Sequence, residues 1–228
     1  MAVYVNTNVS SLNSQRHLTN ASNSLKTSFE RLSSGKRVNS AADDAAGLQI
    51  GARLDAQVGG LNQASRNAND GISLSQTAEG ALDETTTMLQ RMRVLSIQSA
   101  NGSNTSADRG ALDKEFKELQ SEINRVAADT TFGGVALLDG TYTADIQVGA
   151  DANQTIKVAI NASMGTGGLS IAANDITSAA NAQTAITALD AAIAKVTDTR
   201  ADLGAKQNRF SSTIRNLTNI SENVSASK

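Results

Sequence analysis

The strongest pattern of hydrophobic and polar positions lies near the C-terminal end of the chain. Apolar residues recur there in alternating steps of three and four, with few interruptions. This heptad pattern continues for about six repeats and is typical of a long helix that packs along its length against partner helices. The helix-packing seam consists of Ala179, Ala182, Ile186, Leu189, Ile193, Val196, Leu203, Phe210, Ile214, Leu217 and Val224. Thr177 or Ser178 is suited to cap the start of this helix, because a hydroxyl accepts a free backbone N–H of the first turn.

A second long helix is predicted from about Asp44 to Gln98, where two apolar stripes run along different faces. One contains Leu54, Val58, Leu61, Ala68 and Ile72, and the other contains Leu74, Ala78, Ala81, Met88, Met92 and Leu95. A helix with two apolar faces needs two neighbours, which places it at the centre of a bundle. Six glycines lie in this segment. Each lowers helix stability by up to ~1 kcal/mol, so the helix depends on its partners.

Two further helices are predicted from shorter patterns. Leu112, Phe116, Leu119, Ile123 and Val126 form one seam after the polar connection at residues 101–104. This short connection makes the helix an antiparallel neighbour of the preceding one. Near the N-terminus, an amphipathic helix carries Val9, Leu12, Leu18, Ala21, Leu25 and Leu32 and ends around Ser33-Ser34-Gly35.

The period changes from helical to alternating after residue 131. Tyr142, Ala144, Ile146 and Val148, followed by Ile156, Val158 and Ile160, indicate two half-buried strands joined by residues 149–153. The Gly-rich stretch at 161–170 is predicted to be a flexible loop. The fold class is therefore mainly α: an elongated rod of long antiparallel, coiled-coil-like helices with a small β-hairpin region.

Composition argues against most chemistry. Aromatic residues make up only 3% of the 228 residues, Pro and Cys are absent, and the net charge is -2. A general nucleic-acid binder normally has a basic surplus. With His17 as the single histidine, one chain cannot assemble a His-based triad or a zinc site. We therefore expect no enzyme activity, cofactor or metal, and neither a secretory signal nor a membrane span is present in the sequence.

Several long segments resemble bacterial flagellin. They are AVYVNTNVSSLNSQRHL at the start, RLSSGKRVNSAADDAAGLQI at 31–50, NANDGISLSQTAEGALDE at 67–84, QRMRVLSIQSANG at 90–102 and TTFGGVALLDG at 130–140. The final helix from Ala179 onward also resembles the C-terminal core helix of that family. The segments occur in the family's order, which makes the resemblance specific.

The resemblance implies a structural subunit of the flagellar filament that assembles with other flagellin subunits. It also implies secretion through the flagellar type III export apparatus to an extracellular filament. By analogy, residues 1–43 form an inner-tube helix and connector, residues 44–140 and 176–228 form a discontinuous helical rod core, and residues 141–175 form a short solvent-facing excursion. Flagellins normally continue into a further helix after the segment corresponding to 223–228. We therefore expect a truncated chain that does not polymerise normally, with binding of the export chaperone in doubt.

The family's Toll-like receptor 5 site matches this chain at Arg91, Leu95 and Glu115, with Gln90 nearby. Arg91 and Leu95 are four residues apart on one helical face, and Glu115 can lie beside them on the antiparallel neighbour. From the residues alone, Arg91 and Glu115 are more simply a surface ion pair and Leu95 a core residue. The resemblance favours a receptor-docking patch.

Two other functions compete with the filament subunit. One is a soluble truncated flagellin that acts as a receptor ligand, and the other is a flagellar hook–filament junction protein with the same terminal patterning. The dense match at 67–102 favours the filament subunit.

Overall fold

The computed structural model describes residues 8–227, so the first part of the flagellin-like opening motif lies outside the described residues. The chain divides into two compact units. The first extends to residue 56 and the second covers residues 57–227, so the boundary between the two units falls inside a long helix. Each unit is described separately.

The first unit contains helix α1 (Val9–Ser34). The Asn8 side chain caps its start by accepting the backbone N–H of Ser11 at 3.1 Å. Gly35 ends the helix with a φ of 66°, a left-handed conformation that glycine adopts without strain, so the predicted end is confirmed. None of the α1 residues, all of which are described, is buried.

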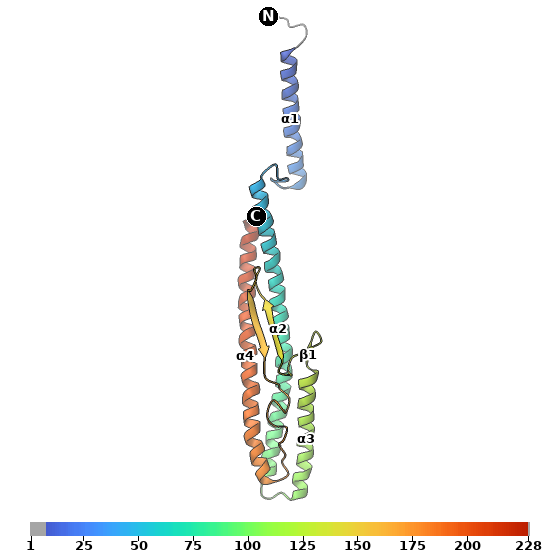
Figure 1. The fold of residues 1–228 in the computed structure, drawn as a ribbon, viewed down its shortest axis with the longest axis vertical. Helices are drawn as coiled ribbons and strands as arrows, with labels where there is room; N and C mark the ends of the chain where they lie inside the picture. Colours follow the sequence, from blue (N-terminus) through green and yellow to red (C-terminus); the bar gives the residue numbers. More distant parts are fainter. Residues whose placement is uncertain (1–7, 228) are drawn as a thin grey trace. The chain divides into compact units, whose positions relative to one another are not determined.

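The second unit is built on three long helices that lie side by side, as Figure 1 shows: α2 (Ala45–Ala100), α3 (Ser106–Asp129) and α4 (Ala179–Ala226). As residue numbers rise along α2, the numbers of its α4 partners fall. Asp83 pairs with Arg200 at 2.9 Å, and Arg93 pairs with Asp190 at 2.6 Å. The two helices are therefore antiparallel. The predicted helices are confirmed, including the passage of α2 through Asn69-Asp70-Gly71.

The buried face of α2 differs in detail from the two predicted stripes. Its buried residues recur mostly in steps of three and four, apart from two adjacent pairs, and include several polar or small side chains: Leu61, Ala64, Ala68, Gly71, Leu74, Ser75, Ala78, Leu82, Thr85, Leu89, Met92, Leu95, Ser96 and Ser99. Leu82 and Leu89 were not predicted, because the sequence pattern assigned the stripe to the adjacent Ala81 and Met88, which are only partly buried against the core.

The predicted seam of α4 is only partly buried. Leu189, Val196, Leu203, Phe210 and Leu217 are buried together with Ala182, Ala185 and Ala192. Ile186, Ile193 and Ile214 are half-buried, and Ile193 and Ile214 pack against the core. Alanines therefore occupy positions that the sequence pattern had assigned to isoleucines, which lets the backbones of α2 and α4 approach closely.

Two small antiparallel sheets lie between α3 and α4 in the chain. Strands β3 (Tyr142–Gln147) and β4 (Thr155–Ile160) pair as predicted, with Ala144 opposite Val158. Strands β1 (Thr131–Phe132) and β2 (Val135–Ala136) form a further short hairpin that the alternation was too brief to predict. Gly133 and Gly134 at its turn have φ values of 58° and 84°.

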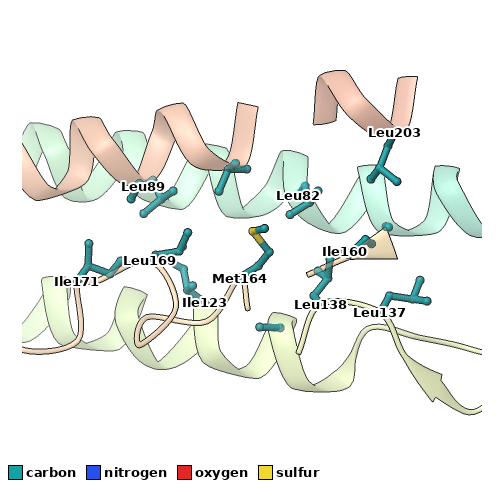
Figure 2. Close-up of a cluster of buried hydrophobic side chains, with 14 of the residues drawn as sticks. Leu82, Leu89, Ile123, Leu137, Leu138, Ile160, Met164, Leu169, Ile171 and Leu203 are labelled. Atoms are coloured by element: carbon teal, nitrogen blue, oxygen red, sulfur yellow. The ribbon is translucent and has the colours of Figure 1, made fainter. Parts of the chain in front are cut away.

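The expected solvent-facing excursion at 141–175 is wrong for the segment after β4. Met164, Leu169, Ile171 and Ile176 are buried, and Figure 2 shows the first three in the space between α3 and the paired helices α2 and α4. Polar side chains of α3 bind the backbone of this segment. Gln120 donates to the carbonyl oxygen of Ile171 at 2.7 Å, and Asn124 accepts the N–H of Thr166 at 2.9 Å. Spaced single apolar residues, and not a continuous pattern, anchor this Gly-rich segment, which we call the core-filling segment (residues 161–178).

Candidate assembly and recognition surfaces

The first unit presents an apolar surface on α1. Its large hydrophobic side chains are exposed by 46% to 79%: Val9, Leu12, Leu18, Leu25, Phe29 and Leu32. Leu18, Leu25 and Leu32 are spaced by seven residues, so they lie on one side of the helix. Arg16, Lys26 and Arg31 add positive charge to the other sides. Such a helix is suited to pack against another helix, because its apolar side is uncovered within its own unit.

The predicted receptor residues are divided between the surface and the core. The Arg91 guanidinium and the Glu115 carboxylate form an ion pair at 2.6 Å, with the two side chains 52% and 45% exposed. Gln90 is exposed beside them. Leu95, in contrast, is 1% exposed and belongs to the core. The patch therefore contains Gln90, Arg91 and Glu115, while Leu95 lies beneath the surface and cannot contribute apolar contact area.

Two exposed apolar residues of α2 lie close to this ion pair in the sequence. Val94 is 53% exposed and Ile97 is 48% exposed. Val94 is three residues after Arg91, which places the two on neighbouring positions of the helix surface. Both residues are outside the three-and-four spacing of the buried positions Leu89, Met92 and Ser96. That spacing is the signal that could have found them: apolar residues that do not fit the seam are free for external contacts.

The buried helix-packing face of α2 contains polar groups that are satisfied within the helix. The hydroxyls of Ser75, Thr85 and Ser96 donate to carbonyl oxygens four residues earlier in α2, at 2.8, 2.9 and 2.8 Å. A buried hydroxyl without a partner would cost about 1–3 kcal/mol, and these bonds remove that cost. Small hydroxyl residues can therefore take the place of long apolar side chains at the buried face of α2.

Among residues 8–227, no group of three His, Asp, Glu or Cys side chains lies close enough to hold a metal ion. His17 is an exposed residue of α1. In the same described part of the chain, no helix is both long and apolar enough to cross a bilayer.

Comparison with known families agrees with the arrangement of the helices. Residues 5–143 match the family model described as bacterial flagellin N-terminal helical region, and residues 186–228 match the bacterial flagellin C-terminal helical region. The chain belongs to the bacterial flagellin family. The unmatched residues between the two regions include β4 and the core-filling segment.

Individual flagellins are similar over most of this chain. Flagellin D of Vibrio anguillarum is 40% identical over 333 aligned positions that cover 100% of this chain and 88% of the relative. The B-type flagellin of Pseudomonas aeruginosa is 58% identical over 161 residues, which cover 70% of this chain and 33% of the relative. Since this flagellin has 228 residues against 333 aligned positions, a difference of 105, the Vibrio protein contains inserted sequence that this chain lacks.

Solved structures support the same assignment. The crystal structure of Bacillus cereus flagellin is 34% identical, has a TM-score of 0.61, and matches 72% of this chain and 95% of that chain. A putative flagellar hook-associated protein from Vibrio parahaemolyticus has a TM-score of 0.70 over 82% of this chain and 98% of that chain, but is only 19% identical. The second likeness concerns the fold alone, so the junction-protein alternative is not favoured. The flagellin is a structural subunit of the flagellar filament that associates with other flagellin subunits, and it is not an enzyme.

Proposed function

We propose that the subunits of this flagellin join through the apolar side of α1 together with exposed surfaces of the second unit. The exposure of every large apolar side chain of α1 is the observation that carries this proposal. In this arrangement, α1 belongs to the inner tube of the filament and the bundle of α2, α3 and α4 belongs to the surrounding rod. The route outward is the flagellar type III export apparatus, and the destination is the extracellular filament.

Incorporation of this chain into polymer formed with a full-length flagellin, measured by sedimentation and electron microscopy, tests the role of α1. Leu25→Ser with Leu32→Ser removes two apolar contacts without changing charge, and we expect loss of incorporation into that polymer. Asn20→Ser with Asn23→Ser is the matched control, because these residues lie on the opposite side of the helix. Equal incorporation of both double variants would exclude the apolar side of α1 from assembly.

A second proposed function is recognition by Toll-like receptor 5 through the α2–α3 surface. The close ion pair of Arg91 and Glu115, exposed on two adjacent helices, favours it. In our proposal, Gln90, Arg91 and Glu115 contact the receptor, and exposed Val94 supplies the apolar contact that the sequence had assigned to Leu95. Buried Leu95 supports the surface from below.

A receptor reporter assay separates these roles. Arg91→Ala and Val94→Ser are expected to weaken signalling without lowering thermal stability. Leu95→Ala is expected to lower both, since it creates a cavity in the core. Arg125→Ala is the control, because Arg125 forms exposed ion pairs with Glu122 and Asp129 on another part of α3. Unchanged signalling by Arg91→Ala with Val94→Ser would remove this function from the chain.

A further inference from the structure

One glycine of α2 is buried against an aromatic ring of α4. Gly71 lies in the interior of α2, where glycine is less stable than alanine. A Cβ atom built on Gly71 would lie 2.8 Å from Cζ of Phe210 and 3.1 Å from each Cε atom. The Phe210 ring therefore occupies the volume that any side chain at position 71 would need. We call this pair the glycine notch.

The glycine notch occurs once along the pairing of α2 with α4. Phe210 is the only aromatic residue in either helix and is fully buried. Of the other α2 glycines in the second unit, Gly59 and Gly80 face open space and Gly60 faces Ala150 of the β3–β4 turn. Gly71 is thus the one position of this part of α2 where a missing side chain admits a residue of α4.

The interface is repetitive on either side of the glycine notch. Leu203 and Leu217 lie seven residues before and after Phe210, and Ala64 and Ala78 lie seven residues before and after Gly71. All four of these flanking residues are buried. Displacing α4 along α2 by one heptad, about 10 Å, would again place leucines and alanines within the seam. A repeating seam of this kind does not by itself select one alignment.

The glycine notch discriminates between the alignments. After a displacement of one heptad, the Phe210 ring would face Ala64 or Ala78, whose methyl groups fill the space that Gly71 leaves free. The interhelical ion pairs would be lost as well. Asp83 would face Ile193 or Gln207 in place of Arg200, and these pairs are exposed enough that they add only weakly to the selection.

We infer that Gly71 and Phe210 form a register lock, which holds α2 and α4 in one of several alignments that the heptad seam would otherwise tolerate. The lock fixes the outer faces of the two helices relative to each other. A subunit in which α4 is displaced by about 10 Å along α2 would present mismatched outer faces to its neighbours. The unfavourable glycine is retained because it specifies the register.

Distances between two spin labels measure the register directly, because the natural chain has no cysteine. Asp70→Cys on α2 and Ala194→Cys on α4 provide exposed labelling sites. The antiparallel alignment separates them by about 28 Å along the helix axes, and a displacement of one heptad changes that separation by about 10 Å. The labelled parent chain is expected to give a single distance by pulsed electron paramagnetic resonance.

The decisive variant combines Gly71→Ala with Phe210→Leu, which replaces the glycine notch by the alanine and leucine found one heptad away on either side. We expect its melting temperature to recover relative to Gly71→Ala alone, while a second distance appears about 10 Å from the first. If the pair serves only to fill space, recovery of stability will be accompanied by a single distance, and the lock is refuted.

Two further variants secure this result. Phe210→Leu alone removes ring atoms without adding a side chain to α2, so it reports on the register even if Gly71→Ala prevents folding. It too is expected to show the second distance, and a single distance would contradict the lock. Gly80→Ala adds the same methyl group to α2 where nothing lies within 4 Å, and it must keep the single distance of the parent.

Discussion

Asp113 of α3 offers a sharp test of how the core-filling segment is held. Its carboxylate accepts the backbone N–H of Ile176 at 3.0 Å and pairs with the Lys117 ammonium at 2.6 Å. The Asp113 side chain is 6% exposed and the Lys117 side chain 59% exposed. We therefore expect the two bonds to contribute unequally to the stability of the fold. The bond to Ile176 satisfies a buried backbone group, whereas the pair with Lys117 lies at the surface.

Three variants separate these contributions. Lys117→Ala removes the exposed pair, which contributes about 0–1 kcal/mol. Asp113→Ala as a single variant removes the same ion pair and also leaves the buried N–H of Ile176 without an acceptor. We expect it to lower the free energy of unfolding by about 2–3 kcal/mol in total. Asp113→Asn keeps an oxygen acceptor for Ile176, and we expect a loss of about 1 kcal/mol, close to that of Lys117→Ala.

Urea unfolding gives the stability of each variant, and amide hydrogen exchange at Ile176 gives the local effect. The exchange of this amide should accelerate strongly in Asp113→Ala and only slightly in Asp113→Asn. Equal losses in Asp113→Ala and Lys117→Ala, with unchanged exchange at Ile176, would show that the backbone bond does not hold this segment.

Three other outcomes are expected. Gly80→Ala should raise the free energy of unfolding by about 0.5–1 kcal/mol, measured in urea, because a methyl group there meets no neighbour and alanine favours the helix. Phe116→Ala should lower it by about 3–5 kcal/mol, seen as a reduced melting temperature, because the fully buried ring leaves a cavity. Hydrogen bonds from Asn181 and Thr177 lower the pKa of Asp175, so this group stabilises the fold above its unfolded pKa of about 4. That contribution is lost as the pH falls through the folded pKa, and Asp175→Asn should make acid unfolding below pH ~4 less steep.

The helices of this flagellin were predictable because their signals are local. The α1 helix ends at Ser33-Ser34-Gly35, where glycine takes the left-handed conformation common at helix ends, and Ser178 caps α4 as one of the two predicted residues. The scattered glycines of α2 did not prevent the prediction of one continuous helix, because the apolar period continues on both sides of each glycine.

What could not be predicted depends on contacts distant in sequence. Ser75 and Thr85 occupy seam positions, but a hydroxyl is recognised as buried only when its own helix satisfies it and a neighbouring helix covers it. Met164 and Ile176 fill the core, yet each stands alone in a Gly-rich or polar stretch, without periodicity. The spacing of Leu95 was compatible with a core residue and with a residue of the receptor patch. Its 1% exposure in the structure assigns it to the core.

The composition of the seam explains why a single notch is needed. Ala182, Ala185 and Ala192 allow close approach of the backbones, and Ala185 and Ala192 repeat the same small side chain one heptad apart. The hydroxyls of Ser75 and Ser96 bond to their own helix, so they place no demand on the position of α4. Both features make a narrow, fully satisfied interface that is indifferent to displacement along its length. Selection of one alignment must then come from the residues that break the repeat, which include Gly71 and Phe210 in the seam, the weaker ion pairs at its edges and the hydrogen bond that Gln207 donates to Glu79 at 2.8 Å.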